Sequence, residues 1–106
     1  MIAKGALKTP YRNKTEEAYA KKLELATACG EVAWWAYEGI SVKLAEGAHY
    51  RCDFAVMLPD GTFEFHEVKG FWREAARVRI KVASSLYPFR FIAVKKNKAG
   101  WEVEEF

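Results

Sequence analysis

Two acidic residues and a lysine in one short stretch have the types and spacing for metal-assisted chemistry. Asp53 opens one apolar run, and a second run ends in Glu67-Val68-Lys69. Side chains of a β-strand alternate between its two faces, so Glu67 and Lys69 point the same way. If the two runs pair as a hairpin, two carboxylates and an ammonium converge at one end of a sheet. Such a group is either a cation site with a catalytic lysine or a cross-strand ion pair.

The same residues can fill the roles that phosphodiester hydrolysis requires. The reaction needs a divalent cation such as Mg²⁺, held by oxygen ligands, and a group that orients the attacking water. Asp53 and Glu67 can supply carboxylates, and the backbone carbonyl of Val68 can add a third ligand. Lys69 then lies beside the water and the phosphate, where it stabilises negative charge as an ammonium or helps to deprotonate the water as the neutral amine. Both runs are rich in large apolar residues, and charges at the end of a buried sheet favour a site over a surface ion pair.

The surrounding sequence predicts one domain of α/β class, an α+β mixed sheet with a helix on each side. The 106 residues suit a single domain. We expect a flexible basic arm over 1–13 and the domain over 14–106. Asn13 or Thr15 can cap a first helix, which Gly30 ends. Hydrophobic periodicity predicts the other elements, which are strands over 32–37, 40–45, 50–58, 62–69, 89–94 and 101–106 and a second helix over 73–86.

Two connections define the expected sheet. The turn sequence around Asp60-Gly61 joins 50–58 and 62–69 as an antiparallel hairpin. The second helix is a crossover, so 89–94 returns parallel to the strand that precedes the helix. The predicted order is one helix, three or four antiparallel strands, a second helix, and one or two strands.

The net charge of +3 is too small to indicate nucleic-acid binding by itself, but its distribution is informative. Arg73, Arg77 and Lys81 recur every four residues along the second predicted helix, with Arg79 nearby. Such a row is typical either of phosphate contact or of a solvated helix face. His49 precedes the Asp53 run and can reach a substrate from a loop.

Other features limit the class of protein. No apolar run is long enough for a transmembrane helix, and the N-terminus lacks the apolar core of a secretory signal. Cys29 and Cys52 lack the spacing of a metal-binding pair, so we expect reduced, structural thiols in a cytoplasmic protein. His66 alternates with Glu67 and therefore faces the opposite layer, which favours a packing role.

Several segments together resemble the PD-(D/E)xK nuclease superfamily. They are YRCDF at 50–54, the turn at 60–61, EVKGFW at 67–72, and NKTEEAYAKKL at 13–23. More narrowly, they are similar to phage endonuclease I-type Holliday-junction resolvases and related small phage nucleases, which share an acidic first helix, a Y-x-P-D-F strand, and E-x-K-G followed by aromatic residues and a basic helix. An exposed aromatic residue among Phe71 and Trp72 could stack on an unpaired base.

The resemblance implies a restriction-endonuclease-like core of order α-β-β-β-α-β and an Mg²⁺-dependent endodeoxyribonuclease, with Mn²⁺ able to substitute. It implies a third metal-binding carboxylate from the first helix, for which Glu16 fits best and Glu17 is the alternative. Branched or Holliday-junction DNA would be the partner, cut by a homodimer, in the host cytoplasm if the protein is phage-encoded.

The sequence departs from the family pattern in two ways. Cys52 stands where the motif has proline; that proline shapes the start of the strand and does not bind metal. The chain is also shorter at its C-terminal end than the junction resolvases and lacks their N-terminal extension, which bears on junction selectivity and dimer formation more than on cleavage. A non-catalytic DNA-binding module of the same fold and a structural accessory protein are the alternatives.

Overall fold

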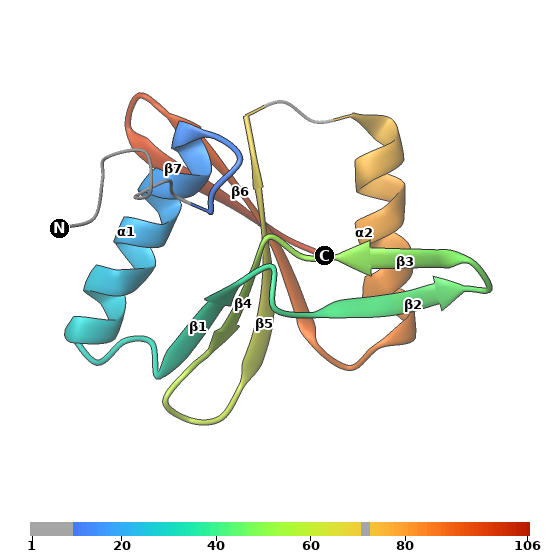
Figure 1. The fold of residues 1–106 in the computed structure, drawn as a ribbon, viewed down its shortest axis with the longest axis horizontal. Helices are drawn as coiled ribbons and strands as arrows, with labels where there is room; N and C mark the ends of the chain where they lie inside the picture. Colours follow the sequence, from blue (N-terminus) through green and yellow to red (C-terminus); the bar gives the residue numbers. More distant parts are fainter. Residues whose placement is uncertain (1–9, 71–72) are drawn as a thin grey trace, which may run out of the picture.

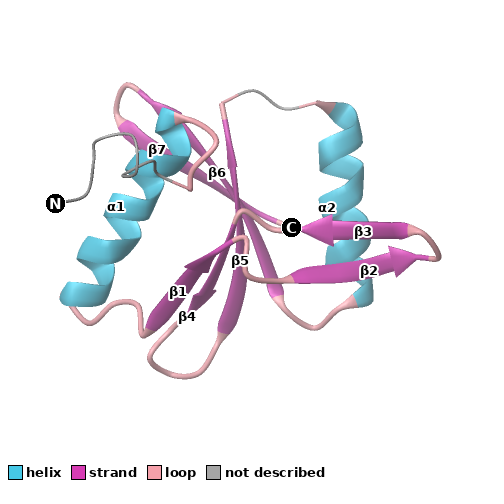
Figure 2. Cartoon of the chain, in the orientation of Figure 1, coloured by secondary structure: helices cyan, strands magenta, loops and turns pink. Residues whose placement is uncertain are grey.

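A mixed five-stranded sheet lies between two helices, and a separate two-stranded hairpin packs beside the second helix (Figure 1). The structure is a computed structural model that describes residues 10–70 and 73–106. The elements are α1 (Lys14–Ala28), β1 (Trp34–Tyr37), β2 (Ser41–Ala45), β3 (Ala48–Arg51), β4 (Phe54–Met57), β5 (Phe63–Lys69), α2 (Glu74–Leu86), β6 (Arg90–Asn97) and β7 (Gly100–Glu105). Figure 2 shows the same elements by type. The predicted α+β architecture with a mixed sheet is confirmed.

Strand β5 is the centre of the large sheet, whose order is β1-β4-β5-β6-β7. It runs antiparallel to β4 through a turn in which Gly61 adopts a φ of 90°, a value that favours glycine. It runs parallel to β6, so α2 is the crossover. Both pairings were predicted, as was β7 at the edge of the sheet. Pairing with β4 ends at His66, whereas pairing with β6 continues through Lys69, so Glu67 and Lys69 are held in position by β6 at the C-terminal end of the strand.

Alternation along β5 divides its side chains between two cores. Phe65 packs with Ile80 on the α2 side, whereas Val68 packs with Tyr19 on the α1 side. His66 is also on the α1 side, where it is buried and shares a 2.6 Å hydrogen bond with the Tyr19 hydroxyl. The packing role predicted for His66 is confirmed, and the next residue, Glu67, is left facing α2.

The single strand predicted over 50–58 is wrong. The chain forms β3, which pairs with β2, and then β4, which pairs with β1 and β5 in the other sheet. The break falls at Cys52 and Asp53, and the Cys52 thiol contacts the Ile40 carbonyl at 3.5 Å. Apolar alternation continues through both halves without a glycine or proline, so the pattern alone does not mark the change of sheet. The structure thus has five strands between the helices instead of three or four.

Helix α1 begins with the predicted cap. The Asn13 side chain accepts a 2.8 Å hydrogen bond from the backbone N–H of Glu16, and the Glu16 carboxylate accepts a 3.0 Å bond back from the backbone N–H of Arg12. This reciprocal arrangement is a variant of the capping box. It fixes both the start of the helix and the carboxylate of Glu16.

Two composition-based expectations can be compared with the described residues. No helix within 10–70 and 73–106 is both long and apolar enough to cross a membrane. Cys29 is exposed and Cys52 is buried, and both are free thiols. The segment 1–9 of the predicted arm lies outside the described residues, as do Phe71 and Trp72.

Candidate active site

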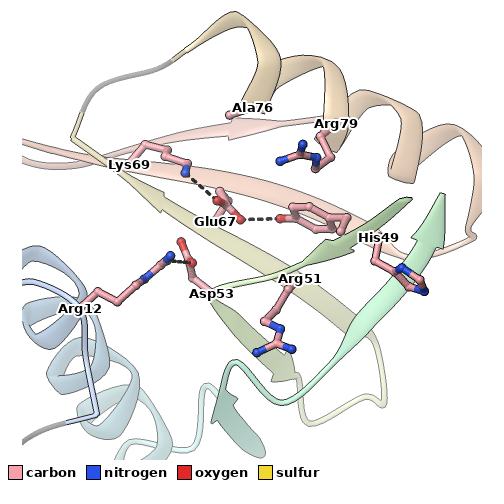
Figure 3. A pocket seen from close by; sticks show the side chains of 9 residues that line it. Arg12, His49, Arg51, Asp53, Glu67, Lys69, Ala76 and Arg79 are labelled. Carbon is pink, nitrogen blue, oxygen red and sulfur yellow. Dashed lines mark hydrogen bonds and ion pairs between the residues drawn. The ribbon is translucent and has the colours of Figure 1, made fainter. Parts of the chain in front are cut away.

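A pocket of about 290 Å³ lies at the C-terminal end of β5, between the β2–β3 hairpin and α2 (Figure 3). Its lining combines carboxylates with cationic side chains. The lining residues are Arg12, His49, Tyr50, Arg51, Asp53, Glu67, Lys69, Ala76 and Arg79. Three of the residues singled out from the sequence therefore meet at one place: Glu67 and Lys69 at the end of β5, and Asp53 from the bend that precedes β4.

Asp53 is placed by the strand that it faces. It is 2% exposed, and its Oδ2 accepts a 2.8 Å hydrogen bond from the backbone N–H of Val68. Because the N–H and C=O of a strand residue point toward the same neighbour, the Val68 carbonyl is directed to the same side as Asp53. The carboxylate thus lies against the backbone next to Glu67.

Glu67 is 7% exposed and is held from two directions. Its Oε2 lies 2.8 Å from Nζ of Lys69, as expected for side chains on the same face of a strand. Its Oε1 accepts a 2.7 Å hydrogen bond from the hydroxyl of Tyr50, which belongs to the hairpin. Burial, followed by the charge of Glu67, raises the pKa of Tyr50, so the phenol remains a donor.

Arg12 is the unexpected member of the cluster. Its Nη2 lies 2.5 Å from Oδ1 of Asp53 and 2.7 Å from Oε2 of Glu16, so one guanidinium group joins two carboxylates from separate elements. Arg12 falls within the predicted flexible arm. A residue at the start of a helix was therefore brought to the end of the sheet by contacts 41 positions apart in sequence.

Glu16 is 1% exposed and each of its oxygens is engaged. Oε1 accepts from the Tyr37 hydroxyl at 2.6 Å, and Oε2 accepts from both Nε and Nη2 of Arg12. The alternative from the sequence, Glu17, lines a different hollow together with Trp35. Of the two acids, Glu16 is the one that shares a partner with Asp53.

The two carboxylates that Arg12 joins differ in acidity. The pKa of Asp53 is raised to about 7, first by burial and then by the nearby charge of Glu67. The hydrogen bond from the Val68 N–H and the charge of Arg12 lower the pKa and offset part of this rise. Burial alone would also raise the pKa of Glu16, but the hydrogen bonds from Arg12 and Tyr37 outweigh it and the pKa is lowered. The folded protein therefore stabilises the negative charge of Asp53 less well than that of Glu16.

The donor set can be compared with the needs of a hard divalent cation. Within residues 10–70 and 73–106, no three His, Cys, Asp or Glu side chains are arranged as a ready-made metal cluster. Asp53 and Glu67 nevertheless present carboxylate oxygens to one pocket, with the Val68 carbonyl beside them. Oxygen ligands of this kind, completed by waters, suit Mg²⁺. The chemistry of these residues therefore fits the expected ion, and Asp53 and Glu67 are the side chains that would hold it.

The basic residues predicted to bind DNA fall into two groups. Arg79 on α2 and His49 on β3 line the pocket. Arg77 and Lys81 line another hollow, where Arg77 forms a bidentate pair with Glu104 at 3.0 and 2.7 Å. Residues two apart on a helix project to nearly opposite sides. Arg79 therefore points away from Arg77 and Lys81.

Arg73 is the fifth residue that was predicted to bind DNA. It is exposed and precedes the first turn of α2. Arg51, which was not singled out, lines the pocket beside His49. Alternation predicts that residue 51 faces opposite to residue 50, and Figure 3 shows the Arg51 side chain directed away from Glu67, at the edge of the pocket that both residues line. The only feature of the sequence that could have indicated Arg51 as a site residue is its position two residues before Asp53.

Comparisons with protein-family models, with curated protein sequences and with solved structures found no match for this chain.

Proposed function

We propose that this protein is an Mg²⁺-dependent endonuclease that hydrolyses phosphodiester bonds in DNA, built on a restriction-endonuclease-like core. The observation that carries the proposal is the meeting of Asp53, Glu67 and Lys69 in one pocket that three arginines also line, Arg12, Arg51 and Arg79. A strand-end lysine beside two buried carboxylates supplies the parts that metal-assisted phosphodiester hydrolysis requires. The resemblance of the motifs at 50–54 and 67–72 to PD-(D/E)xK nucleases supports the same function.

The roles follow from the positions of the side chains. Asp53 and Glu67 would hold the cation with the Val68 carbonyl, and Glu16 would complete or tune the site. When bound, Mg²⁺ supplies charge stabilisation at the phosphate and a water that loses its proton more easily. Lys69, which Glu67 holds at 2.8 Å, can stabilise the developing charge as an ammonium or, as the neutral amine, accept a proton from the attacking water.

The cationic wall supports a polyanionic substrate. Arg51 and His49 line the pocket from the hairpin, and Arg79 lines it from α2 (Figure 3). A phosphodiester chain lying between the hairpin and the helix would meet positive charge on both sides of the scissile phosphate. Branched or Holliday-junction DNA, cut by a homodimer, is the substrate that the family resemblance favours, since such nucleases select the shape of the DNA.

Cleavage assays with matched variants test the proposal. Supercoiled plasmid, flapped duplex and four-way junctions are incubated with Mg²⁺ and either the wild type, Asp53→Asn or Lys69→Ala. We expect both variants to lose about 100-fold or more in rate. Asp60→Asn, at the exposed turn between β4 and β5, and Lys98→Ala, at the exposed turn between β6 and β7, are controls of the same chemical type and should cleave like the wild type.

Two results would count against the proposal. Failure of the pure wild type to cut any of the three substrates would reject the nuclease, whereas equal nicking by Asp53→Asn and Lys69→Ala would reject the assigned site. Mn²⁺ in place of Mg²⁺ should preserve cleavage by the wild type.

A non-catalytic DNA-binding module is the second candidate, and one observation favours it. Each pocket carboxylate already has a cationic partner, Arg12 for Asp53 and Lys69 for Glu67. A site that only binds DNA could use these pairs to hold its shape. Binding of DNA without cleavage, together with no effect of Asp53→Asn on affinity for Ca²⁺, would favour this candidate; the absence of DNA binding would favour a structural accessory protein.

A further inference from the structure

The guanidinium of Arg12 lies between two carboxylates that the proposed metal site needs. Nη2 alone is 2.5 Å from Oδ1 of Asp53 and 2.7 Å from Oε2 of Glu16. Nε adds a second bond to Glu16 at 3.1 Å and lies 3.8 Å from Oε2 of Glu38. A positive group therefore takes the central position in a cluster of three acids.

These bonds use the oxygens that would bind a metal ion. The second oxygen of Asp53 accepts from Val68, and the second oxygen of Glu16 accepts from Tyr37. The remaining two oxygens, Oδ1 of Asp53 and Oε2 of Glu16, both accept from Nη2 of Arg12. Because like charges repel, a divalent cation cannot bind between Asp53 and Glu16 while the guanidinium remains there.

Arg12 is anchored by its backbone and not by burial of its side chain. Its N–H is fixed on Glu16 in the helix cap, and the preceding Tyr11 packs edge-on against Tyr37 with ring centroids 4.8 Å apart. The Arg12 side chain is 59% exposed. The guanidinium can therefore move into solvent without unfolding the cap and without exposing apolar surface.

We propose that Arg12 is a resident counter-ion of Asp53 and Glu16 that a divalent metal ion must displace, so that Arg12 sets the threshold for metal loading. This inference rests on the proposed function, because it assumes that Asp53 is a metal ligand. In the apo protein Arg12 keeps the two carboxylates together and correctly oriented. On loading, the guanidinium would leave Asp53 and Glu16, and their oxygens would become available as ligands.

Calorimetric titration with Ca²⁺ in the absence of DNA tests the displacement directly. The measurement is made at pH 8.5, above the pKa of about 7 of Asp53, so that this carboxyl is ionised in the wild type. Arg12→Gln should bind Ca²⁺ about tenfold more tightly, since charge-assisted hydrogen bonds no longer have to be broken. Arg79→Gln removes the same charge from the same pocket. It should change the affinity for Ca²⁺ by less than about threefold, because exposed charges interact only weakly.

The outcomes separate the inference from the function on which it rests. Equal affinity for Arg12→Gln and wild type, or equal tightening by Arg79→Gln, overturns the role of Arg12 while leaving the metal site intact. The absence of Ca²⁺ binding by wild type and Arg12→Gln alike overturns the metal site and the inference with it. Binding by Arg12→Gln alone supports both.

A second measurement uses the wild type and does not depend on the stability of a variant. The Nε–H of Arg12 donates to Glu16, so its nuclear magnetic resonance signal reports that bond. Saturating Ca²⁺ should move this signal to the position of a solvated guanidinium, with Arg12→Lys serving to assign it. A signal that stays in place under saturating Ca²⁺ overturns displacement.

Discussion

The hydroxyl of Tyr50 donates a 2.7 Å hydrogen bond to Oε1 of Glu67, and the two residues belong to different sheets. Tyr50 comes from the β2–β3 hairpin and Glu67 from the central strand. The carboxylate proposed to bind metal is therefore oriented by an element outside the sheet that carries it. Groups that orient a metal ligand in this way affect activity strongly even though they do not touch the metal.

Tyr50→Phe should lower the cleavage rate and the affinity for Mg²⁺ by roughly tenfold, because Glu67 loses the donor that orients it. The free energy of unfolding should fall by about 1 kcal/mol for the lost hydrogen bond. Rates on a four-way junction and urea unfolding give the two quantities. Tyr87→Phe is the matched control, since the Tyr87 hydroxyl donates to the Lys43 carbonyl away from the pocket. A similar loss of rate in both variants would show that only the position of the hairpin matters.

The stability of the protein should fall as the pH rises from about 4 to about 7, through the titration of Asp53. Its pKa is raised by burial from 3.8 to about 7, so the folded state holds this proton more tightly than the unfolded state does. Asp53→Asn cannot ionise and should lack this dependence. In the presence of a chelator, the variant should gain roughly 3 kcal/mol relative to the wild type across this range. Urea midpoints at four pH values measure the difference, and parallel curves for the two proteins would contradict it.

DNA affinity should depend on Arg79 and not on Arg77, although both lie on α2. Arg79 lines the pocket, whereas Arg77 is paired with Glu104 on another side of the helix. With Ca²⁺ in place of Mg²⁺, Arg79→Ala should weaken binding and reduce the slope of log affinity against log salt by about 1. Arg77→Ala should leave that slope unchanged. Fluorescence anisotropy at several salt concentrations checks both, and equal slopes for the two variants would place the DNA elsewhere.

The Tyr19–His66 pair should contribute to stability and not to catalysis. It lies on the α1 side of the sheet, and the other ring nitrogen of His66 lies 2.8 Å from Oε1 of Glu64. Tyr19→Phe leaves a buried imidazole nitrogen without that partner and should cost about 1 to 3 kcal/mol of unfolding free energy. Cleavage by the folded variant should match the wild type. A selective loss of cleavage at unchanged stability would instead link this pair to the site.

The sequence was sufficient where local chemistry determines the structure. The Asn13 side chain needs only a backbone N–H of the following turn to cap a helix. The turn residues around Gly61 are sufficient to predict the hairpin between β4 and β5. Alternation along β5 placed Glu67 and Lys69 on one face and His66 on the other, as observed. These features depend on a few adjacent residues, so a single sequence contains the information.

The remaining features depend on contacts between distant residues. Arg12 lies in a basic segment typical of a frayed terminus, and its place in the site depends on Asp53, 41 positions away. The division of 50–58 between two sheets depends on the pairing of β3 with β2, which no local signal at Cys52 announces. The positions of Arg77 and Arg79 were limited by helical geometry, but Glu104 on β7 decides which of them is already paired.

We expect the β2–β3 hairpin, which forms one wall of the pocket, to detach at a lower free energy than the five-stranded sheet unfolds. An isolated two-stranded hairpin is at best marginally stable in water, so this one is held by its packing near Tyr87 and by the bond from Tyr50 to Glu67. Detachment of the hairpin would leave the five-stranded sheet paired while removing one wall of the pocket. Such partial opening needs less free energy than global unfolding. The free energy that keeps the pocket assembled is therefore separate from the free energy of global unfolding. Hydrogen exchange at the backbone amides of β3 measures the free energy of hairpin opening.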